Sequence, residues 1–329
     1  MRLRVGAAAT VAAVALLGGC ALPASITGKD QAGPRAPLSS ASASGDGGGA
    51  GVPSDASSLA SAAQEMATRD NGTGAPADSP GVVTDPSAML GGDISWPQCP
   101  PGMGIPQKRS TGQPMPLPDA EFVVVGLTDG PGFVANPCLK SQVQWVKVHR
   151  LPLSAYSVVS YPDAKDLAKY GADGPYDPST LPGRLKNVGY QEATYNVGSM
   201  GSAGLNTPLV WLDVESVPDF DWPANNTANN AAVVQGEARG YKEAGYAVGV
   251  YGTPTIWKGI VGGLTLGGNV PEWRAAGQTS QAEATIRCGS AWSIQGGQGV
   301  LGQWVEERRD RNLTCPGAMG DLSKWFDRG

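Results

Sequence analysis

The chain has 329 residues, of which 41% are hydrophobic, and its 24 basic and 29 acidic side chains give a net charge of −5. A mildly acidic chain without a basic cluster interleaved with aromatic residues is not expected to bind nucleic acid. A metal site is disfavoured as well, because the chain has one histidine and no Cys-x-x-Cys spacing.

The first residues are typical of an export signal. Arg2 and Arg4 precede an apolar run that is too short to cross a bilayer, and small residues then lead into Cys20. The Leu-Gly-Gly-Cys ending resembles a bacterial lipobox, in which the cysteine becomes the lipidated first residue; an ordinary secretory signal with a chance cysteine is the alternative. We expect a lipoprotein signal peptide over residues 1–20 and an extracytoplasmic protein that lipid on Cys20 anchors to the bacterial cell membrane.

Two further parts follow the signal. Residues 21–88 are mostly Ala, Ser, Gly, Pro, Asp and Thr, and such a segment buries too little apolar surface to offset its ordering entropy. We expect it to be a disordered tether. Residues 89–329 are rich in Trp, Tyr, Val and Gly and fit a single barrel-sized domain. We expect this domain to be monomeric and to need no cofactor.

Seven apolar runs along this domain predict strands. Helical spacing predicts helices over residues 139–149 and 228–244, whereas residues 161–206 are predicted to form an elaborated loop with short helices near the mouth. Strands that alternate with helices indicate a parallel sheet. Seven or eight such strand–helix units favour an α/β fold of the (β/α)8 type, a TIM-like barrel in which irregular strands are allowed for. The predicted strands are residues 92–96, 121–127, 153–159, 208–216, 247–251, 271–275 and 301–305.

The fourth of these runs, residues 208–216, carries the most information about function. Four apolar residues lead into Asp213 and Glu215. Because side chains alternate along a strand, both carboxylates project from one face at the end where α/β folds build active sites. Two carboxylates on one face are what glycoside hydrolysis requires, with one protonated and one ionised. The alternative is that they cap the following helix or pair with an arginine.

Other strand ends carry acids too. Asp93 lies in the first strand, Asp129 follows the second, and Asp321 follows the last. In a barrel these ends meet at one mouth, so the sequence predicts one shared acidic pocket.

The cysteines that remain after Cys20 predict two disulfides, because their number is even and the domain is predicted to be exported. Three pairings are possible. We favour the one in which each bridge joins loops after successive strands, namely Cys99–Cys138 and Cys288–Cys315.

The order of these motifs resembles glycoside hydrolase family 25, the lysozyme-like muramidases with a modified (β/α) barrel. The family's Asp-Val-Ser with a nearby Gln, Thr-Glu-Gly, Asp-x-Glu, strand-ending Tyr, Trp-x-Ala, Gln-Tyr and Val-Asp-Leu-Asn motifs have counterparts here in the same order. Those counterparts are 93–95 with Gln98, 128–130, Asp213 with Glu215, 251–253, 273–275, 303–304 and 320–323.

This chain also departs from the family pattern. Tyr156 is followed by Ser157 where the family usually has Tyr-His-Phe, and Gly126 with Leu127 replaces a common basic residue. Asp129 replaces a glutamate. These changes affect the expected pocket wall rather than the central pair, so they put the identity of the substrate in doubt before the activity.

The resemblance implies roles for individual residues. Glu215 would be the general acid, with a raised pKa, and Asp213 its ionised partner that orients an N-acetyl group or stabilises charge on the sugar. Asp93 and Asp321 would complete the acidic floor. Trp211 and Trp304 are further candidates for stacking on sugars, although Trp211 fits the core better. The expected substrate-binding residues are Trp96, Asp129, Tyr156, Tyr251, Trp273 and Gln303.

Two functions follow as hypotheses. The first is a membrane-anchored glycosidase of the muramidase type that acts on cell-envelope glycan, most of all peptidoglycan. The second is a catalytically silent glycan-binding lipoprotein with the same barrel and acidic pocket. The retained carboxylates favour the first, and the altered ends of the second and third strands favour the second.

Overall fold

The computed structural model describes residues 87–217 and 219–328. The predicted signal peptide, the lipidation of Cys20 and nearly all of the predicted tether lie outside these residues. Within the described ranges, no helix combines the length and apolar character needed to span a membrane.

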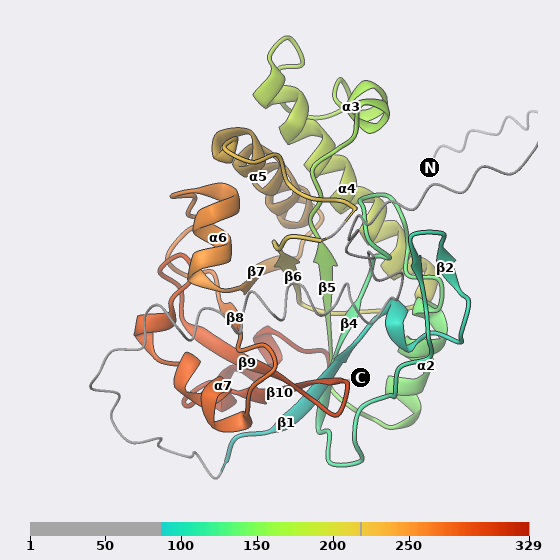
Figure 1. Ribbon diagram of the computed structural model, residues 1–329, viewed down its shortest axis with the longest axis vertical. Coiled ribbons are helices and arrows are strands. Elements are labelled where there is room, and N and C mark those ends of the chain that lie inside the picture. Colours follow the sequence, from blue (N-terminus) through green and yellow to red (C-terminus); the bar gives the residue numbers. More distant parts are fainter. Residues whose placement is uncertain (1–86, 218, 329) are drawn as a thin grey trace, which may run out of the picture. The chain divides into compact units, whose positions relative to one another are not determined.

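The predicted barrel is confirmed. Eight strands close into one sheet in the order β1-β10-β9-β8-β7-β6-β5-β4, and all neighbouring pairs are parallel except the two that involve β10 (Figure 1). The antiparallel β10 makes the barrel irregular. The strands are β1 Leu90–Ile94, β4 Phe122–Gly126, β5 Leu153–Val158, β6 Leu209–Asp213, β7 Ala247–Gly252, β8 Glu272–Ala275, β9 Gly299–Glu306 and β10 Arg309–Thr314.

Strand β10 was absent from the sequence prediction. It begins with the polar run Arg309 to Asn312, so it lacks the apolar signal of the other strands. It returns from β9 through a two-residue turn in which Glu307 and Arg308 both have positive φ. Turns of this kind normally contain Asn or Gly, and neither residue is present here.

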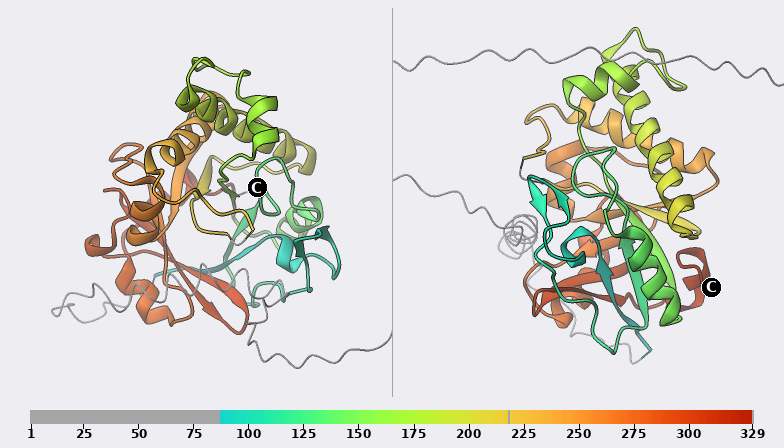
Figure 2. Two further views of the ribbon diagram at one scale, coloured as in Figure 1. Left: turned by 45° about the horizontal axis from the view of Figure 1, so that its top comes forward. Right: turned by 90° about the vertical axis from the view of Figure 1, so that its right-hand side faces the viewer.

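The helices cover the outside of the barrel. The helices predicted over residues 139–149 and 228–244 are confirmed. Helices α4 and α5 lie side by side (Figure 2), and α5 also contacts β6 and β7. The helices are α2 Leu139–Val148, α3 Ala164–Tyr170, α4 Leu181–Ala203, α5 Thr227–Glu243, α6 Pro254–Val261 and α7 Gln281–Arg287.

The prediction of a loop with short helices over residues 161–206 was wrong, because α4 is 23 residues long. Its helical signal is weakened by glycines, one of which, Gly189, is required for packing against α5. An added Cβ at Gly189 would lie 2.1 Å from the carbonyl oxygen of Val233, and one at Gly236 would lie 2.0 Å from that of Lys186. The two helices therefore approach backbone to backbone, which larger residues would prevent.

The barrel interior is a packed core that closes one end of the barrel. Trp211 and Trp273 fill its middle, and Phe122 meets Phe326 edge to face with ring centroids 5.0 Å apart. Phe326 follows the 3-10 helix η4 (Met319–Lys324), which packs against the end where the parallel strands begin. The open end is therefore the one where those strands finish, the usual location of active sites in this fold.

Both predicted disulfides are present. Cys99–Cys138 joins the segment after the 3-10 helix η2 (Trp96–Gln98) to the start of α2, and Cys288–Cys315 joins the end of α7 to the segment after β10. The segment that the first bridge encloses contains the barrel strand β4 and a small hairpin, β2 (Gly104–Ile105) and β3 (Lys108–Arg109).

Candidate active site

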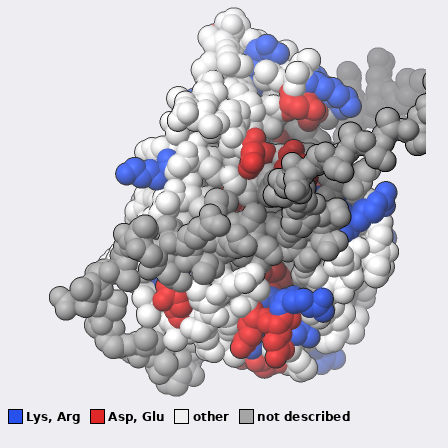
Figure 3. All heavy atoms as spheres, viewed as in Figure 1, with Lys and Arg blue, Asp and Glu red and all other residues white. Residues whose placement is uncertain are grey.

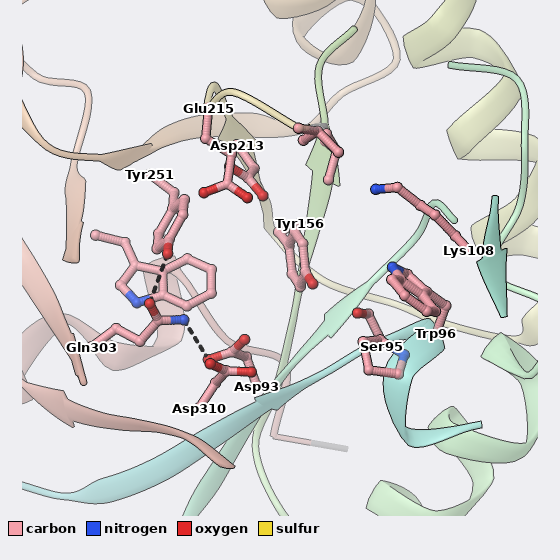
Figure 4. A pocket seen from close by; sticks show the side chains of 14 residues that line it. Asp93, Ser95, Trp96, Lys108, Tyr156, Asp213, Glu215, Tyr251, Gln303 and Asp310 are labelled. Atoms are coloured by element: carbon pink, nitrogen blue, oxygen red, sulfur yellow. Dashed lines mark hydrogen bonds between the residues drawn. The ribbon is translucent and has the colours of Figure 1, made fainter. Parts of the chain in front are cut away.

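The carboxyl groups of Asp213 and Glu215 lie in one pocket at the open end of the barrel, as predicted (Figure 4). Asp213 is the last residue of β6 and faces inward like Leu209 and Trp211, since alternate residues share a face. It is only 4% exposed. Glu215 follows two residues later and is half-buried. The structure thus has a deep carboxyl and a shallower one on the same wall.

A second acidic pair faces the first. Asp93 on β1 and Asp310 on β10 are direct partners across the antiparallel ladder, so their side chains project together from the inner face of the sheet. Figure 4 shows this pair across the pocket from Asp213 and Glu215. Asp93 was predicted here, whereas Asp310 was missed together with its strand.

Asp321, which was predicted to complete the acidic floor, does not line this pocket. It lies in η4, at the closed end, and pairs with the amine of Lys324 at 2.9 Å. The error came from missing β10, so that Asp321 was expected directly after the parallel strand β9. Because β10 runs back across the barrel, the chain after it emerges at the opposite end from the mouth.

A chain of hydrogen bonds holds Asp93 in place. Its Oδ1 accepts from Gln303 Nε2 at 2.9 Å and from Asn312 Nδ2 at 2.6 Å. The Tyr251 hydroxyl in turn donates to Gln303 Oε1 at 2.7 Å, and the Trp273 indole donates to Asn312 Oδ1 at 2.8 Å. Gln303, Tyr251 and Trp273 thus line the pocket as expected, and their part in substrate binding stays a prediction.

Tyr156 occupies space that a side chain at residue 126 would otherwise take. A Cβ at Gly126 would lie 2.5 Å from Ser95 Cβ and 2.7 Å from Tyr156 Cζ. Tyr156 and Trp96 both line the pocket. Gly126 therefore leaves room for the half-buried ring of Tyr156, which forms part of the pocket wall.

Asp129 has a different place from the one predicted, since it is 1% exposed and is not among the residues that line the pocket. Its Oδ2 accepts from the Ile105 amide at 3.1 Å and lies beside Gly104, which has a φ of 106°. Asp129 therefore fastens the β2–β3 hairpin to the end of β4. Burial raises its pKa to about 6.

That hairpin carries Lys108, a pocket residue that no motif in the sequence indicated. Its side chain is 4% exposed, and its amine lies 5.7 Å from the Trp96 ring centroid and 5.6 Å from that of Phe220. Burial lowers its pKa, while Glu215 and other nearby carboxyls oppose that shift. Only the fold brings this lysine over the acids, because it lies in a polar loop far from the strand ends.

Burial controls the protonation of the acids. It raises the pKa of Glu215 to about 7, with Lys108 acting in the opposite direction. Burial, followed by the charges of Glu215 and Asp93, raises the pKa of Asp213 well above its ordinary value. Burial and Asp310 do the same for Asp93 despite its amide donors. Burial therefore shifts all three carboxyls toward their protonated forms, and the ionised state expected of Asp213 stays a prediction.

The two other tryptophans that were considered for sugar stacking lie outside the pocket. Trp211 is fully buried and its indole donates to the Ser154 hydroxyl at 3.0 Å, as a core residue would. Trp304 is 1% exposed, faces outward from the barrel among Ala284 and Leu313, and is covered by the Arg311 guanidinium. Among the residues that the structure describes, no group of three or more His, Cys, Asp or Glu side chains is arranged to hold a metal ion.

Comparisons with known proteins differ in how much of the chain they cover. A family model described as Lysozyme-like protein 1 matches residues 180–287, which run from the cap of α4 to the end of α7 and include Asp213 and Glu215. A probable GH family 25 lysozyme 4 from Dictyostelium discoideum is 32% identical over 97 residues, which are 30% of this chain and 44% of the relative. The chain thus spans less than half the length of that relative.

Solved structures are similar at lower identity. The bacterial lysozyme from Streptomyces coelicolor is 16% identical with a TM-score of 0.46, over 73% of this chain and 98% of that one. The modular autolysin LytC from Streptococcus pneumoniae, solved in complex with a synthetic peptidoglycan ligand, is 15% identical with a TM-score of 0.42, over 69% of this chain and 46% of that one. The match to the lysozyme-like family model thus covers the segment that carries the Asp-x-Glu pair.

Proposed function

We propose that this protein is a glycoside hydrolase of the muramidase type that cleaves the glycan of peptidoglycan. The observation that carries the proposal is the carboxyl pair of β6. Glu215 is half-buried at the mouth with a pKa near 7, and Asp213 lies beneath it. The match of this segment to a lysozyme-like family model, together with the 32% identity to a probable GH family 25 lysozyme over 97 residues, supports the same activity.

Glu215 is the general acid in this proposal. A carboxyl that remains protonated near neutral pH can donate to the glycosidic oxygen as the bond to the leaving sugar breaks. The proton moves from the Glu215 carboxyl to that oxygen, and the resulting carboxylate is then favoured by the nearby Lys108 amine. Lys108 therefore assists the charge that Glu215 acquires on donating its proton.

Asp213 is proposed to act on the N-acetyl group or the ring of the sugar whose glycosidic bond breaks. Its Oδ1 is buried and has no hydrogen-bond partner in the described part of the chain. Positive charge that develops on the sugar would favour its ionised form. The carboxylate would then orient a substrate N-acetyl group, whose oxygen is the internal nucleophile that the family resemblance implies, or stabilise the charged ring directly.

The reaction is tested by the release of reducing sugar from peptidoglycan by the purified full-length protein. Glu215→Gln keeps the shape of the side chain but cannot donate the proton, and it is expected to slow release by about 10²–10⁴-fold. Glu307→Gln is the matched control, because that glutamate is exposed in the β9–β10 turn and should leave the rate unchanged.

The same assay decides between the enzyme and a silent glycan-binding protein. A folded protein that binds peptidoglycan but releases no reducing sugar would establish the binding protein and refute the hydrolase. Release that Glu215→Gln leaves intact would show that another group is the acid.

We also propose that the barrel works at the outer face of the bacterial cell membrane, held there by lipid on Cys20. The proposal rests on the small residues that precede this cysteine and on the apolar run before them. Mass spectrometry of the N-terminal peptide from a bacterial membrane fraction tests it, since a lipidated Cys20 is expected at the start of the mature chain.

A further inference from the structure

A second cavity, of about 670 Å³, lies beside the candidate active site. It is bounded by α3, α4 and the loops that follow β4 and β6, and the mechanism above uses none of its side chains. Phe220 lines it and also contacts Lys108 of the first pocket, with the amine 5.6 Å from the ring centroid. The two cavities therefore adjoin at Phe220.

Glu192 is the most unusual group in the lining of this second cavity. It is 2% exposed, and its Oε2 has no hydrogen-bond partner among the described residues. A Cβ at Gly132 would lie 2.1 Å from its Oε1, so the glycine leaves room for the carboxyl. A buried carboxyl oxygen without a partner costs free energy that a bound ligand can recover.

Aromatic rings form another wall of the cavity. Phe133 stacks on Tyr170 with centroids 3.9 Å apart and meets Tyr195 edge to face at 5.8 Å. Its φ of 62° lies in the left-handed region, which non-glycine residues rarely adopt. Such strain is concentrated at ligand sites, and ring faces attract cations. The backbone at Phe133 is thus held in an unfavourable conformation that places its ring in the cavity wall.

The charges of the lining also favour a cation. Five carboxyls compete with two lysines, and the amine of Lys169 is already engaged with the Tyr170 hydroxyl at 2.6 Å. Acidic and basic side chains are both visible on the face around α3 (Figure 3). The acids that line the cavity are Asp163, Asp166, Glu192, Asp219 and Asp221.

From this geometry we propose that the second cavity binds a primary ammonium group at the end of a short aliphatic chain, as in a lysine side chain of a peptide. The ammonium pairs with Glu192 and lies against the rings of Phe133 and Tyr195. Burial and the charge of Glu237 raise the pKa of Glu192, and a cation, unlike a neutral sugar, would favour its ionised form. A peptide that branches from a bound glycan would reach the cavity from the adjoining pocket, and in that form the inference rests on the proposed function.

Isothermal titration calorimetry of the full-length protein tests the site. The probe is Nα-acetyl-lysine methylamide, and Nα-acetyl-norleucine methylamide has a similar chain without the charge. The lysine probe is expected to bind and the norleucine probe to bind at least about tenfold more weakly, as the loss of a charge-assisted hydrogen bond predicts. Equal affinities, or no binding of the lysine probe, would overturn the proposal.

Variants assign the binding to Glu192. Glu192→Gln is expected to weaken the affinity for the lysine probe by about tenfold or more. Glu307→Gln, at an exposed position, should leave that affinity unchanged. If Glu192→Gln does not fold, Asp166→Asn, at the half-buried edge of the cavity, replaces it and is also expected to weaken binding. Unchanged affinity in the folded variant, or displacement of the probe by chitotriose, contradicts an ammonium site.

Binding and hydrolysis fail separately in these experiments. Glu215→Gln, which is expected to stop the release of reducing sugar, should leave the affinity for the lysine probe unchanged. If the protein hydrolyses peptidoglycan but does not bind the lysine probe, the ammonium site alone is refuted. If it binds the lysine probe but does not hydrolyse peptidoglycan, the proposed function alone is refuted.

Discussion

The pKa of Glu215 predicts the pH range in which the protein works. At a pKa of about 7, about nine-tenths of Glu215 is protonated at pH 6 and about one-tenth at pH 8. At the ordinary value of 4.5, only about 3% would be protonated at pH 6. Burial of this single carboxyl therefore increases the amount of available acid at pH 6 by about thirtyfold. Above pH 7, kcat/KM should fall by about tenfold per pH unit.

Substitution of Lys108 tests the physical origin of this value. The lysine charge lowers the pKa of Glu215 against the larger effect of burial. Lys108→Met should therefore move the alkaline limb of the kcat/KM profile to higher pH. Arg109→Met is the matched control, because it removes a positive charge from the same hairpin at an exposed position whose guanidinium donates to the Gly102 carbonyl at 2.7 Å.

The assay is the initial rate of reducing-sugar release from soluble peptidoglycan fragments between pH 4 and pH 9. The position of the limb is decisive, since Lys108 lines the pocket and its loss can also change the rate itself. A limb centred near pH 4.5, or a limb that Lys108→Met and Arg109→Met displace equally, would refute the assignment of Glu215 as a buried acid tuned by Lys108.

Two further substitutions test the packing beside the pocket and the effect of the buried Glu237 on stability. Gly126→Ala places a methyl group 2.5 Å from Ser95 Cβ and should lower the free energy of unfolding by about 1–3 kcal/mol. The control Gly320→Ala places its methyl group in open space and should change the free energy of unfolding by under about 0.5 kcal/mol. Equal urea midpoints for the two variants would contradict this expectation. Burial raises the pKa of Glu237 to about 8, so between about pH 5 and 8 the folded state keeps a proton that the unfolded chain has lost. Its share of stability then falls by about 1.4 kcal/mol per pH unit; Glu237→Gln should remove that slope in urea titrations, and parallel profiles would contradict it.

The sequence was informative wherever a strand is buried on both faces. The seven apolar runs all became barrel strands, and the pair Asp213 and Glu215 was placed correctly, because a continuous apolar run fixes both the strand and the side-chain alternation at its end. The disulfide pairing also followed from that topology.

The sequence was uninformative where long-range packing overrides local preference. Strand β10 is polar and antiparallel, so its acid Asp310 was missed and Asp321 was selected in its place. Helix α4 was missed because its glycines weaken the helical signal, although one of them, Gly189, is what allows close contact with α5. Lys108 could not be found from local pattern at all, since its position depends on the hairpin that Asp129 fastens to the barrel.

The two acidic pairs of the pocket differ in how far the protein itself satisfies them. Asp93 Oδ1 already accepts two amide hydrogen bonds, and those amides are fixed by Tyr251 and Trp273. Asp213 Oδ1 is equally buried but has no partner among the described residues. An unsatisfied buried acceptor is unfavourable unless a donor arrives with the substrate. The β6 side of the pocket is therefore the side prepared for the reacting sugar, and the β1–β10 side is a rigid wall opposite it.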